Sequence, residues 1–304
     1  MSEIEREIAS QPACWREAAL RGARSQGELP RAGTRVCVVG CGTSLYMAQS
    51  LAALRERAGH GETDAFPASE APLGRSYEAV IAISRSGTTT EVVRYLHDVR
   101  TPHRVAIVGV PDSPLAETAD RVIGLEFADE RSVVQTRFAT SVLAFARAFL
   151  GEDLEPVAAQ AEVALGEPLP LDPSEHDHYV SLGVGWSVGL ANEAALKLRE
   201  AARTWTESYP AMEFRHGPIS VVRPGSVVWA LGAVDTGVLE DARAAGATVL
   251  GGDLDPMVEL VRIQRTAAAL AVSRGLDPDH PRNLTRSVIL PSVEGPRTIR
   301  SART

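Results

Sequence analysis

Short apolar runs rich in branched residues alternate along the chain with longer segments whose apolar residues recur at helical spacing. This alternation predicts buried strands connected by helices. In the first half, the predicted strands are residues 36–39, 79–83, 105–108 and 122–127, and the predicted helices are residues 45–57, a segment starting near residue 91, and residues 132–150. The pattern is typical of an α/β fold in which helices cover both faces of a mainly parallel sheet.

The second half of the chain repeats this plan. Its predicted strands are residues 179–183, 227–231 and 247–250, and its predicted helices are residues 189–206, 237–245 and 256–274. Between the halves, the proline-rich segment 151–173 is typical of a helix followed by an extended linker. We therefore predict a helical arm at residues 1–34, a first α/β domain at residues 35–165 and a second at residues 175–304.

The most informative turn follows the predicted strand 79–83 and reads Ser84-Arg85-Ser86-Gly87-Thr88-Thr89-Thr90. It leads into a helix, and the first N–H groups of a helix lack internal partners and carry partial positive charge. The turn adds five hydroxyl groups and a guanidinium, whereas an ordinary helix cap needs one hydroxyl. We therefore predict a cradle for a phosphate monoester.

A second hydroxyl-bearing turn, Gly40-Cys41-Gly42-Thr43-Ser44, follows the strand 36–39. In a parallel sheet both turns lie at the edge where ligands bind. Leu45 stands where a dinucleotide-binding fingerprint needs a third glycine, which argues against a nucleotide-dependent oxidoreductase. The turn after residues 227–231 carries Asp235, whose carboxylate repels phosphate. We expect one phosphate site per chain, in the first half.

The predicted helix 189–206 places Glu193, Lys197 and Glu200 on one face, at positions i, i+4 and i+7. Such a stripe is often only a solvated row of ion pairs. Lys197, however, is the single lysine of the chain, and the other 30 of its 31 basic residues are arginine. This favours a functional face. His216 precedes a Gly-Pro turn and, taken alone, would be interpreted as an exposed histidine.

Composition excludes several classes of protein. The 304 residues are 44% hydrophobic and contain no apolar run long enough to span a membrane, which together with the charged N-terminus predicts a cytoplasmic protein with no membrane partner. A net charge of −8 provides no basic face for nucleic acid. The three cysteines are Cys14, Cys37 and Cys41, and this odd number makes a disulfide framework an unfavoured interpretation.

Five segments together resemble the phosphosugar isomerase (SIS) family. They are Cys41-Gly42-Thr43-Ser44, Ser84-Arg85-Ser86-Gly87-Thr88-Thr89, Glu193-Ala194-Ala195-Leu196-Lys197-Leu198-Arg199-Glu200, Arg215-His216-Gly217-Pro218, and the segment from Asp279 to Val288. The nearest patterns are the isomerase half of glucosamine-6-phosphate synthase and the tagatose-6-phosphate ketose/aldose isomerase and amino-sugar-phosphate deaminase branch. The segments occur in consistent order over residues 35–290.

The resemblance implies two flavodoxin-like α/β/α domains and a homodimer with its site at the subunit interface. It also implies that neither a metal nor another cofactor takes part. The residues implied to hold the sugar phosphate are Thr43, Ser44, Ser84, Arg85, Ser86 and Thr89. Glu200 would be the base that moves a proton between C1 and C2, and Lys197 and Glu193 would position or polarise the substrate. His216 would reach in from the partner subunit and open the sugar ring.

Several departures from the synthase pattern bear on activity. The chain starts at Met1 with about 30 residues before the first strand, so we expect no glutaminase domain. Arg286 stands where the synthases carry a Schiff-base lysine, and a guanidinium stays protonated, although it still donates hydrogen bonds to a sugar oxygen. The segment 130–137, with Val133 and Gln135 as candidate substrate contacts, resembles the tagatose-6-phosphate isomerase branch.

The sequence therefore predicts a phosphosugar aldose–ketose isomerase or an amino-sugar-6-phosphate deaminase that works by enediolate proton transfer. The alternative is a regulator that binds a sugar phosphate without turning it over.

Overall fold

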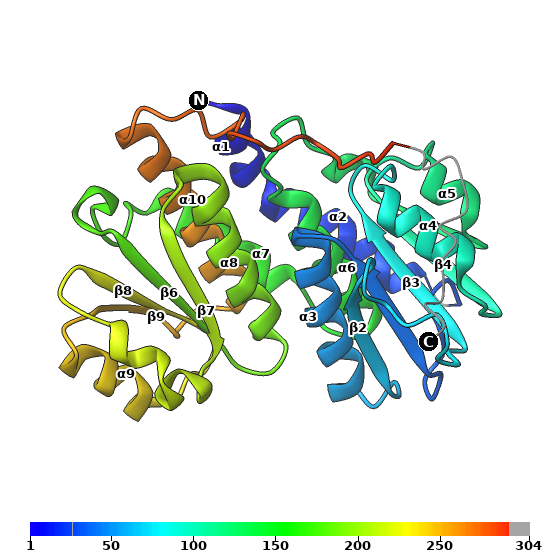
Figure 1. Cartoon of the computed structure of the whole chain (residues 1–304), viewed down its shortest axis with the longest axis horizontal. Coiled ribbons are helices and arrows are strands. Elements are labelled where there is room, and N and C mark those ends of the chain that lie inside the picture. Colours follow the sequence, from blue (N-terminus) through cyan, green and yellow to red (C-terminus); the bar gives the residue numbers. More distant parts are fainter. Residues whose placement is uncertain (26, 292–304) are drawn as a thin grey trace, which may run out of the picture.

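The computed structural model describes residues 1–25 and 27–291, and its frame is a pair of parallel sheets (Figure 1). The first sheet contains β1 (Val36–Gly40), β2 (Thr63–Pro67), β3 (Ala79–Ser84), β4 (His103–Val108) and β5 (Arg121–Gly124). The strand order is β2-β1-β3-β4-β5, which is the flavodoxin-like order. The edge between β1 and β3 is the point where the direction of winding reverses, so the turns after these two strands border one crevice.

The second sheet contains β6 (His178–Gly183), β7 (Trp205–Pro210), β8 (Ser226–Leu231) and β9 (Thr248–Gly251). Its order, β7-β6-β8-β9, repeats that of the first sheet without the fifth strand. All pairs in both sheets are parallel, which confirms the predicted α/β class.

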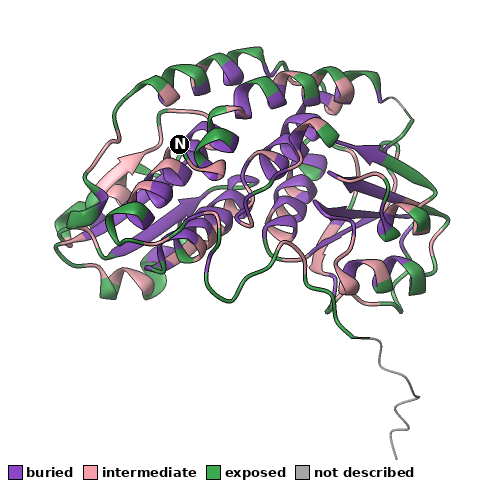
Figure 2. Cartoon of the chain, turned by 90° about the horizontal axis from the view of Figure 1, so that it is seen from above, coloured by how far each residue is buried: buried purple, intermediate pink, exposed green. Residues whose placement is uncertain are grey.

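Helices cover both faces of each sheet. In chain order they are α1 (Glu3–Ala9), α2 (Gln11–Arg24), α3 (Thr43–Arg57), α4 (Thr90–Asp98), α5 (Pro114–Thr118), α6 (Arg137–Phe149), α7 (Glu155–Gly166), α8 (Ser187–Ala202), α9 (Thr236–Ala244) and α10 (Pro256–Ser273). The largest apolar core is formed by α2, α3, α6, α8 and α10 with the inward faces of both sheets, and Figure 2 shows this buried centre. Smaller cores lie under α4 and α5 and under α9.

Two strands were missed and two helix boundaries were predicted wrongly, each for a physical reason. The strands β2 and β7 are partly exposed edge strands with mixed polar sequences, so they lack the continuous apolar run of a central strand. Helix α8 ends at Ala202 rather than at residue 206, because Arg203 adopts a left-handed conformation. Helix α6 begins at Arg137 rather than at residue 132, since the Glu130 carboxylate binds the N–H groups of Thr136 and Arg137.

Two further features bear on the predictions from composition. None of the helices within the described ranges is long and apolar enough to cross a membrane. Cys14, Cys37 and Cys41 are all free thiols.

The predicted helical arm packs closely against the first domain, since Trp15 of α2 is fully buried and donates a hydrogen bond from Nε1 to Thr140 Oγ1 at 2.8 Å.

The close approach of α8 to α3 depends on Gly189. A Cβ atom at this position would lie 2.3 Å from Ser50 Oγ and 2.4 Å from the Tyr46 carbonyl oxygen, both on α3. We expect Gly189→Ala to lower the free energy of unfolding by about 1–3 kcal/mol, measured by urea titration. The control is Gly166→Ala at the end of α7, where a Cβ atom meets nothing within 4 Å and the change is expected to be neutral or stabilising. Equal effects of the two substitutions would contradict this.

Candidate active site

The predicted face of α8 meets the first residue of α3 in a buried polar cluster. The Lys197 side chain is almost fully buried, and its Nζ lies 2.5 Å from Glu200 Oε2, 3.3 Å from Glu193 Oε1 and 3.0 Å from Thr43 Oγ1. The Thr43 hydroxyl also donates to Glu193 Oε1 at 3.1 Å. Thr43, Glu193, Lys197 and Glu200 therefore form a buried polar cluster and not a solvated stripe, and we take this cluster as the core of the candidate site.

Burial and charge give the three ionisable groups of the cluster different properties. Burial raises the pKa of Glu193 to about 7, while the neighbouring Lys197 ammonium opposes the rise. Burial acts to lower the pKa of Lys197, but the carboxylates of Glu193 and Glu200 outweigh it, and the net shift is upward. The Glu200 side chain alone reaches the surface, with 18% of its area exposed. The cluster thus presents one accessible carboxylate, held against a buried cation.

The predicted phosphate cradle forms the turn between β3 and α4. The Ser84 hydroxyl oxygen accepts a hydrogen bond from the Gly87 N–H at 3.1 Å, and Ser86 Oγ accepts one from the Thr88 N–H at 3.2 Å. Thr89 is the N-cap residue of α4, yet its side chain makes no capping hydrogen bond. The corresponding helix of the second half is different, because the Asp235 carboxylate caps α9 by accepting from two N–H groups. A helix N-terminus with hydroxyls and without a carboxylate cap suits an anion.

Ser44 is buried in the first turn of α3. It completes the set of six predicted phosphate contacts, whose other members are Thr43, Ser84, Arg85, Ser86 and Thr89. It follows β1, and the cradle follows the adjacent strand β3. Two of the predicted turns thus lie at the same edge of the first sheet. The cluster on α8 is joined to this edge through Thr43.

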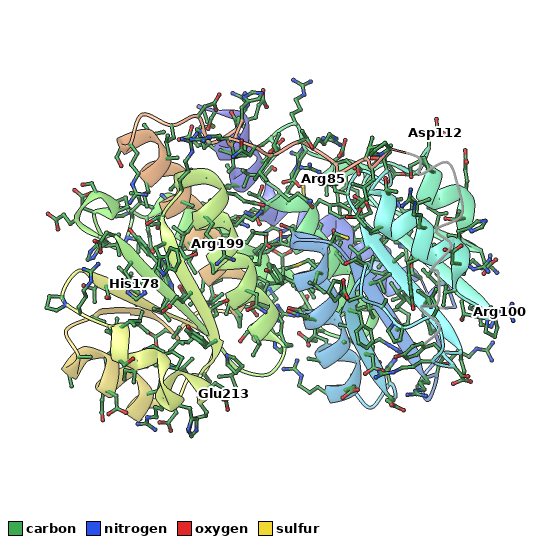
Figure 3. The ribbon with its side chains drawn as sticks, in the orientation of Figure 1. Arg85, Arg100, Asp112, His178, Arg199 and Glu213 are labelled. Atoms are coloured by element: carbon green, nitrogen blue, oxygen red, sulfur yellow. The ribbon has the colours of Figure 1, made fainter. Side chains whose placement is uncertain are left out.

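Arg85, predicted to be the fixed cation of the cradle, is held in place by backbone groups. It is buried, and its guanidinium donates to the carbonyl oxygens of Ser132 at 2.8 Å and Arg286 at 3.0 Å, with the Glu130 carboxylate at 3.9 Å. Burial lowers the pKa of Arg85, although Glu130 opposes this shift. In this arrangement Arg85 fixes two backbone segments beside the cradle, the loop 130–136 and the C-terminal segment. Figure 3 shows Arg85 on the side where the two halves meet.

The C-terminal segment 279–290 runs over the cradle. Val288 accepts a hydrogen bond from the Thr90 N–H at 3.2 Å, and the Leu290 N–H donates to Thr90 Oγ1 at 2.9 Å. Figure 1 shows this segment passing from the end of α10 towards α4. It also meets the loop 130–136, because the Val133 N–H donates to the Asp279 carbonyl oxygen at 3.1 Å. The segment therefore forms one wall of the site.

Two further predicted substrate contacts, Arg286 and Gln135, have different surroundings. Arg286 does not face an open sugar site, because its guanidinium donates to the Asp129 carboxylate and the Glu130 carbonyl oxygen. The side-chain amide oxygen of Gln135, Oε1, is buried and has no hydrogen-bond partner among the described residues. Gln135 thus keeps an unused acceptor.

His216 is not brought to the cluster within one chain. It is exposed at the end of a short 3-10 helix, Glu213–His216, and it makes no hydrogen bond or ion pair with Glu193, Lys197 or Glu200 in the part of the chain that the structure describes. Figure 3 shows Glu213, at the start of that helix, well separated from Arg85.

Sequence reasoning missed two carboxylates that hold the site walls. The Glu7 carboxylate of α1 accepts a hydrogen bond from the Arg131 N–H at 2.6 Å, and the Asp279 carboxylate accepts from the N–H groups of Glu3 and Ile4 at 2.8 and 2.6 Å. Burial raises the pKa of Glu7 to about 7, and the neighbouring Glu130 adds to the rise. These contacts join residues more than 120 positions apart, so no local pattern indicates them.

The chain is similar to known proteins over most of its length. The glutamine–fructose-6-phosphate aminotransferases (isomerizing) of Symbiobacterium thermophilum and Sulfolobus acidocaldarius are 28% and 29% identical to the chain, over 85% and 84% of its length. These alignments cover 52% and 50% of the two relatives, so the chain spans about half the length of the curated relatives it matches.

Solved structures match over nearly the whole chain. A glucosamine-6-phosphate deaminase of Thermotoga maritima superposes with a TM-score of 0.81 and 26% identity, covering 95% of this chain and all of that one. The tagatose-6-phosphate ketose/aldose isomerase of Escherichia coli shares the fold, with a TM-score of 0.77, 21% identity and 97% coverage of each chain. Residues 28–150 match the SIS domain family. This segment, which contains the first sheet and the cradle, is therefore similar to an SIS domain.

Proposed function

We propose that the chain is a phosphosugar enzyme, either an aldose–ketose isomerase or an amino-sugar-6-phosphate deaminase. The observation that carries the proposal is the accessible Glu200 carboxylate 2.5 Å from the buried Lys197 amine. Moving a proton between C1 and C2 of an open-chain sugar needs a carboxylate base beside a cation that stabilises the enediolate. The glucosamine-6-phosphate deaminase named above, at 26% identity, supports this substrate class.

In this proposal the phosphate lies in the cradle. Its ligands are hydroxyl and N–H groups of the turn Ser84–Thr89 together with Thr43 and Ser44, while Arg85 positions the surrounding loops. Glu200 removes and returns the proton. Lys197 stabilises the negative charge that develops on the sugar oxygen, and Glu193 keeps the amine in place through its contact of 3.3 Å.

We also propose a homodimer in which His216 of one chain completes the site of the other. Ring opening needs a group that accepts and donates a proton near neutral pH, and imidazole is the side chain suited to this. The exposure of His216 in the single chain supports a role across a subunit interface. The free thiols suit a reducing compartment, which supports the cytoplasm.

The domain plan is part of the same proposal. We infer that the helical arm, residues 1–34, precedes a first SIS domain at residues 35–165, and that residues 175–304 are a second, divergent SIS domain. The support is the shared strand order of the two sheets. The Asp235 carboxylate, which caps α9 in the second half, supports the proposal of one phosphate site per chain, in the first half.

The test is a panel of hexose 6-phosphates and hexosamine 6-phosphates, assayed for ammonia release and for aldose–ketose interconversion. At least one compound is expected to be turned over and to raise the melting temperature, because a ligand of the native state stabilises it. Stabilisation without turnover would favour the regulator. No stabilisation and no turnover with any compound would overturn the proposal.

A further inference from the structure

A pocket of about 420 Å³ opens on the outer side of Glu200. It lies where the end of α8 meets the start of the C-terminal segment. Its lining consists of Arg199, Glu200, Arg203, Arg282, Asn283 and Leu284. We call it the arginine pocket. It shares Glu200 with the catalytic cluster, so a substrate that touches this carboxylate also borders the pocket.

The charges of the pocket are unbalanced. Its lining contains three arginines and a single carboxylate, Glu200, which Lys197 already contacts at 2.5 Å. The Arg199 guanidinium donates to the carbonyl and hydroxyl oxygens of Thr206 at 3.1 and 3.2 Å, which leaves Arg203 and Arg282 as the cations available to a ligand. Within residues 1–25 and 27–291, neither Arg199, Arg203 nor Arg282 has a carboxylate within ion-pair distance. The chain as a whole carries a net charge of −8. A local excess of unpaired cations in an acidic protein favours an anionic ligand.

The backbone of the pocket is also unusual. Only two residues other than glycine have positive φ in the described part of the chain, Arg203 at 51° and Asn283 at 65°, and both line this pocket. Asparagine tolerates this conformation, but an arginine there is strained. Strained residues concentrate at functional sites.

The simplest explanation for the backbone conformation of Arg203 is that this residue ends helix α8. That role does not require an arginine. The Arg203 N–H donates to the Arg199 carbonyl oxygen at 3.1 Å, so it closes the C-terminus of α8, and a cation is favourable there. Glycine is the usual residue at such a position, because it adopts positive φ without strain. The arginine side chain thus provides something that the helix end itself does not require.

We propose that the arginine pocket binds a second anionic group of the substrate, carried at the C1–C2 end of a phosphosugar. This inference rests on the proposed function, which places C1 and C2 at Glu200. With the 6-phosphate in the cradle and these carbons at Glu200, a phosphate or carboxylate substituent on them projects into the pocket. Guanidinium groups bind both kinds of oxyanion through charge-assisted hydrogen bonds. The substrate class is then a doubly anionic phosphosugar.

The experiment compares the affinities of fructose 6-phosphate and fructose 1,6-bisphosphate by calorimetry at low ionic strength. The wild-type protein is expected to bind the bisphosphate about tenfold more tightly, since two exposed arginines, Arg203 and Arg282, act on one anion. In Arg282→Gln and Arg203→Gly this ratio is expected to fall towards one. The ratio compares the affinities of one variant for the two sugars. A general loss of sugar binding lowers both affinities and therefore leaves the ratio unchanged.

Two controls separate charge and folding from specific binding. Arg100→Gln removes another exposed arginine, on the far side of the molecule as Figure 3 shows, and is expected to keep the tenfold ratio. Arg203→Gly relieves the strained backbone, so it is expected to leave the melting temperature unchanged or higher. A lost ratio in a protein that melts no earlier cannot come from unfolding.

Three results would overturn the proposal. The first is equal binding of both sugars by the wild-type protein, which leaves the proposed function intact. The second is simultaneous binding of inorganic pyrophosphate and fructose 6-phosphate, with only the pyrophosphate lost in Arg282→Gln. This result would mean that the pocket binds an anion from a separate molecule and not a second group of the substrate. The third is that neither sugar binds, which also counts against the proposed function. In that case a pyrophosphate titration of the wild-type protein and Arg282→Gln decides whether the pocket holds any anion.

Discussion

Glu200→Gln is expected to reduce turnover of the responsive phosphosugar by about 10²–10⁴-fold, the usual contribution of a general base. Glutamine keeps the length of the side chain and a hydrogen-bonding oxygen for Lys197, but it does not accept the substrate proton. The loss should therefore fall on kcat. The side chain lies at the rim of the site with 18% of its area exposed, so a large loss of stability is not expected. Ammonia release and ketose formation measure the first effect, and thermal melting measures the second.

The matched control is Glu240→Gln, an exposed glutamate on α9. It makes the same chemical change on a helix of the same half of the chain, and turnover is expected to stay within about twofold. Turnover by Glu200→Gln near the wild-type rate would rule out this carboxylate as the base. A similar loss in both variants would point to a general effect of charge.

The parts of the fold predicted from sequence are those whose burial leaves a local pattern. Strand β3, covered on both faces, consists of the apolar run Ala79–Ile83 followed by a serine, and its position was predicted almost to the residue. Strand β7 reads WTESYP and lies at a sheet edge, so its hydrogen bonds to β6 define it and its side chains do not. Edge strands of this kind need the neighbouring strand to be known first.

The same distinction applies to the site. Glu193 and Lys197 are one helical turn apart, so their contact follows from helix geometry alone. The contact of Thr43 with both residues joins positions 150 or more apart, and it depends on the packing of α3 against α8. Arg85 shows most clearly which contacts cannot be predicted from the sequence alone. Its place in a hydroxyl-rich turn suggested a phosphate ligand, whereas its partners, two carbonyl groups from distant segments, were visible only in the structure.

Lys197→Met is expected to cost about 3–5 kcal/mol of unfolding free energy at pH 8, because it leaves the fully buried Glu193 carboxylate without its cation. The pKa of Glu193, about 7, already lies above its ordinary value of 4.5, and removing the ammonium that opposes this rise moves it higher still. A carboxyl group with a raised pKa contributes stability that is complete below pH 4.5 and is lost as the pH rises through the pKa of the folded state. The penalty should therefore be smaller at pH 6, where Glu193 takes up a proton, and grow by at most about 1.4 kcal/mol per pH unit. Urea titrations at pH 6 and pH 8 measure it.

The double variant Lys197→Met/Glu193→Gln isolates the cause. With glutamine at position 193 no charge is left buried, and Thr43 Oγ1 keeps a hydrogen-bond acceptor in place of Glu193 Oε1. The double variant is expected to recover most of the lost stability and to lose the added pH dependence, while turnover remains abolished in both variants for want of the amine. If the single variant were equally stable at pH 6 and pH 8, the buried charge would not be the source of the penalty. Recovery of stability without recovery of turnover would show that the chain keeps this amine for chemistry, since a buried ion pair is often replaceable by uncharged groups without loss of folding.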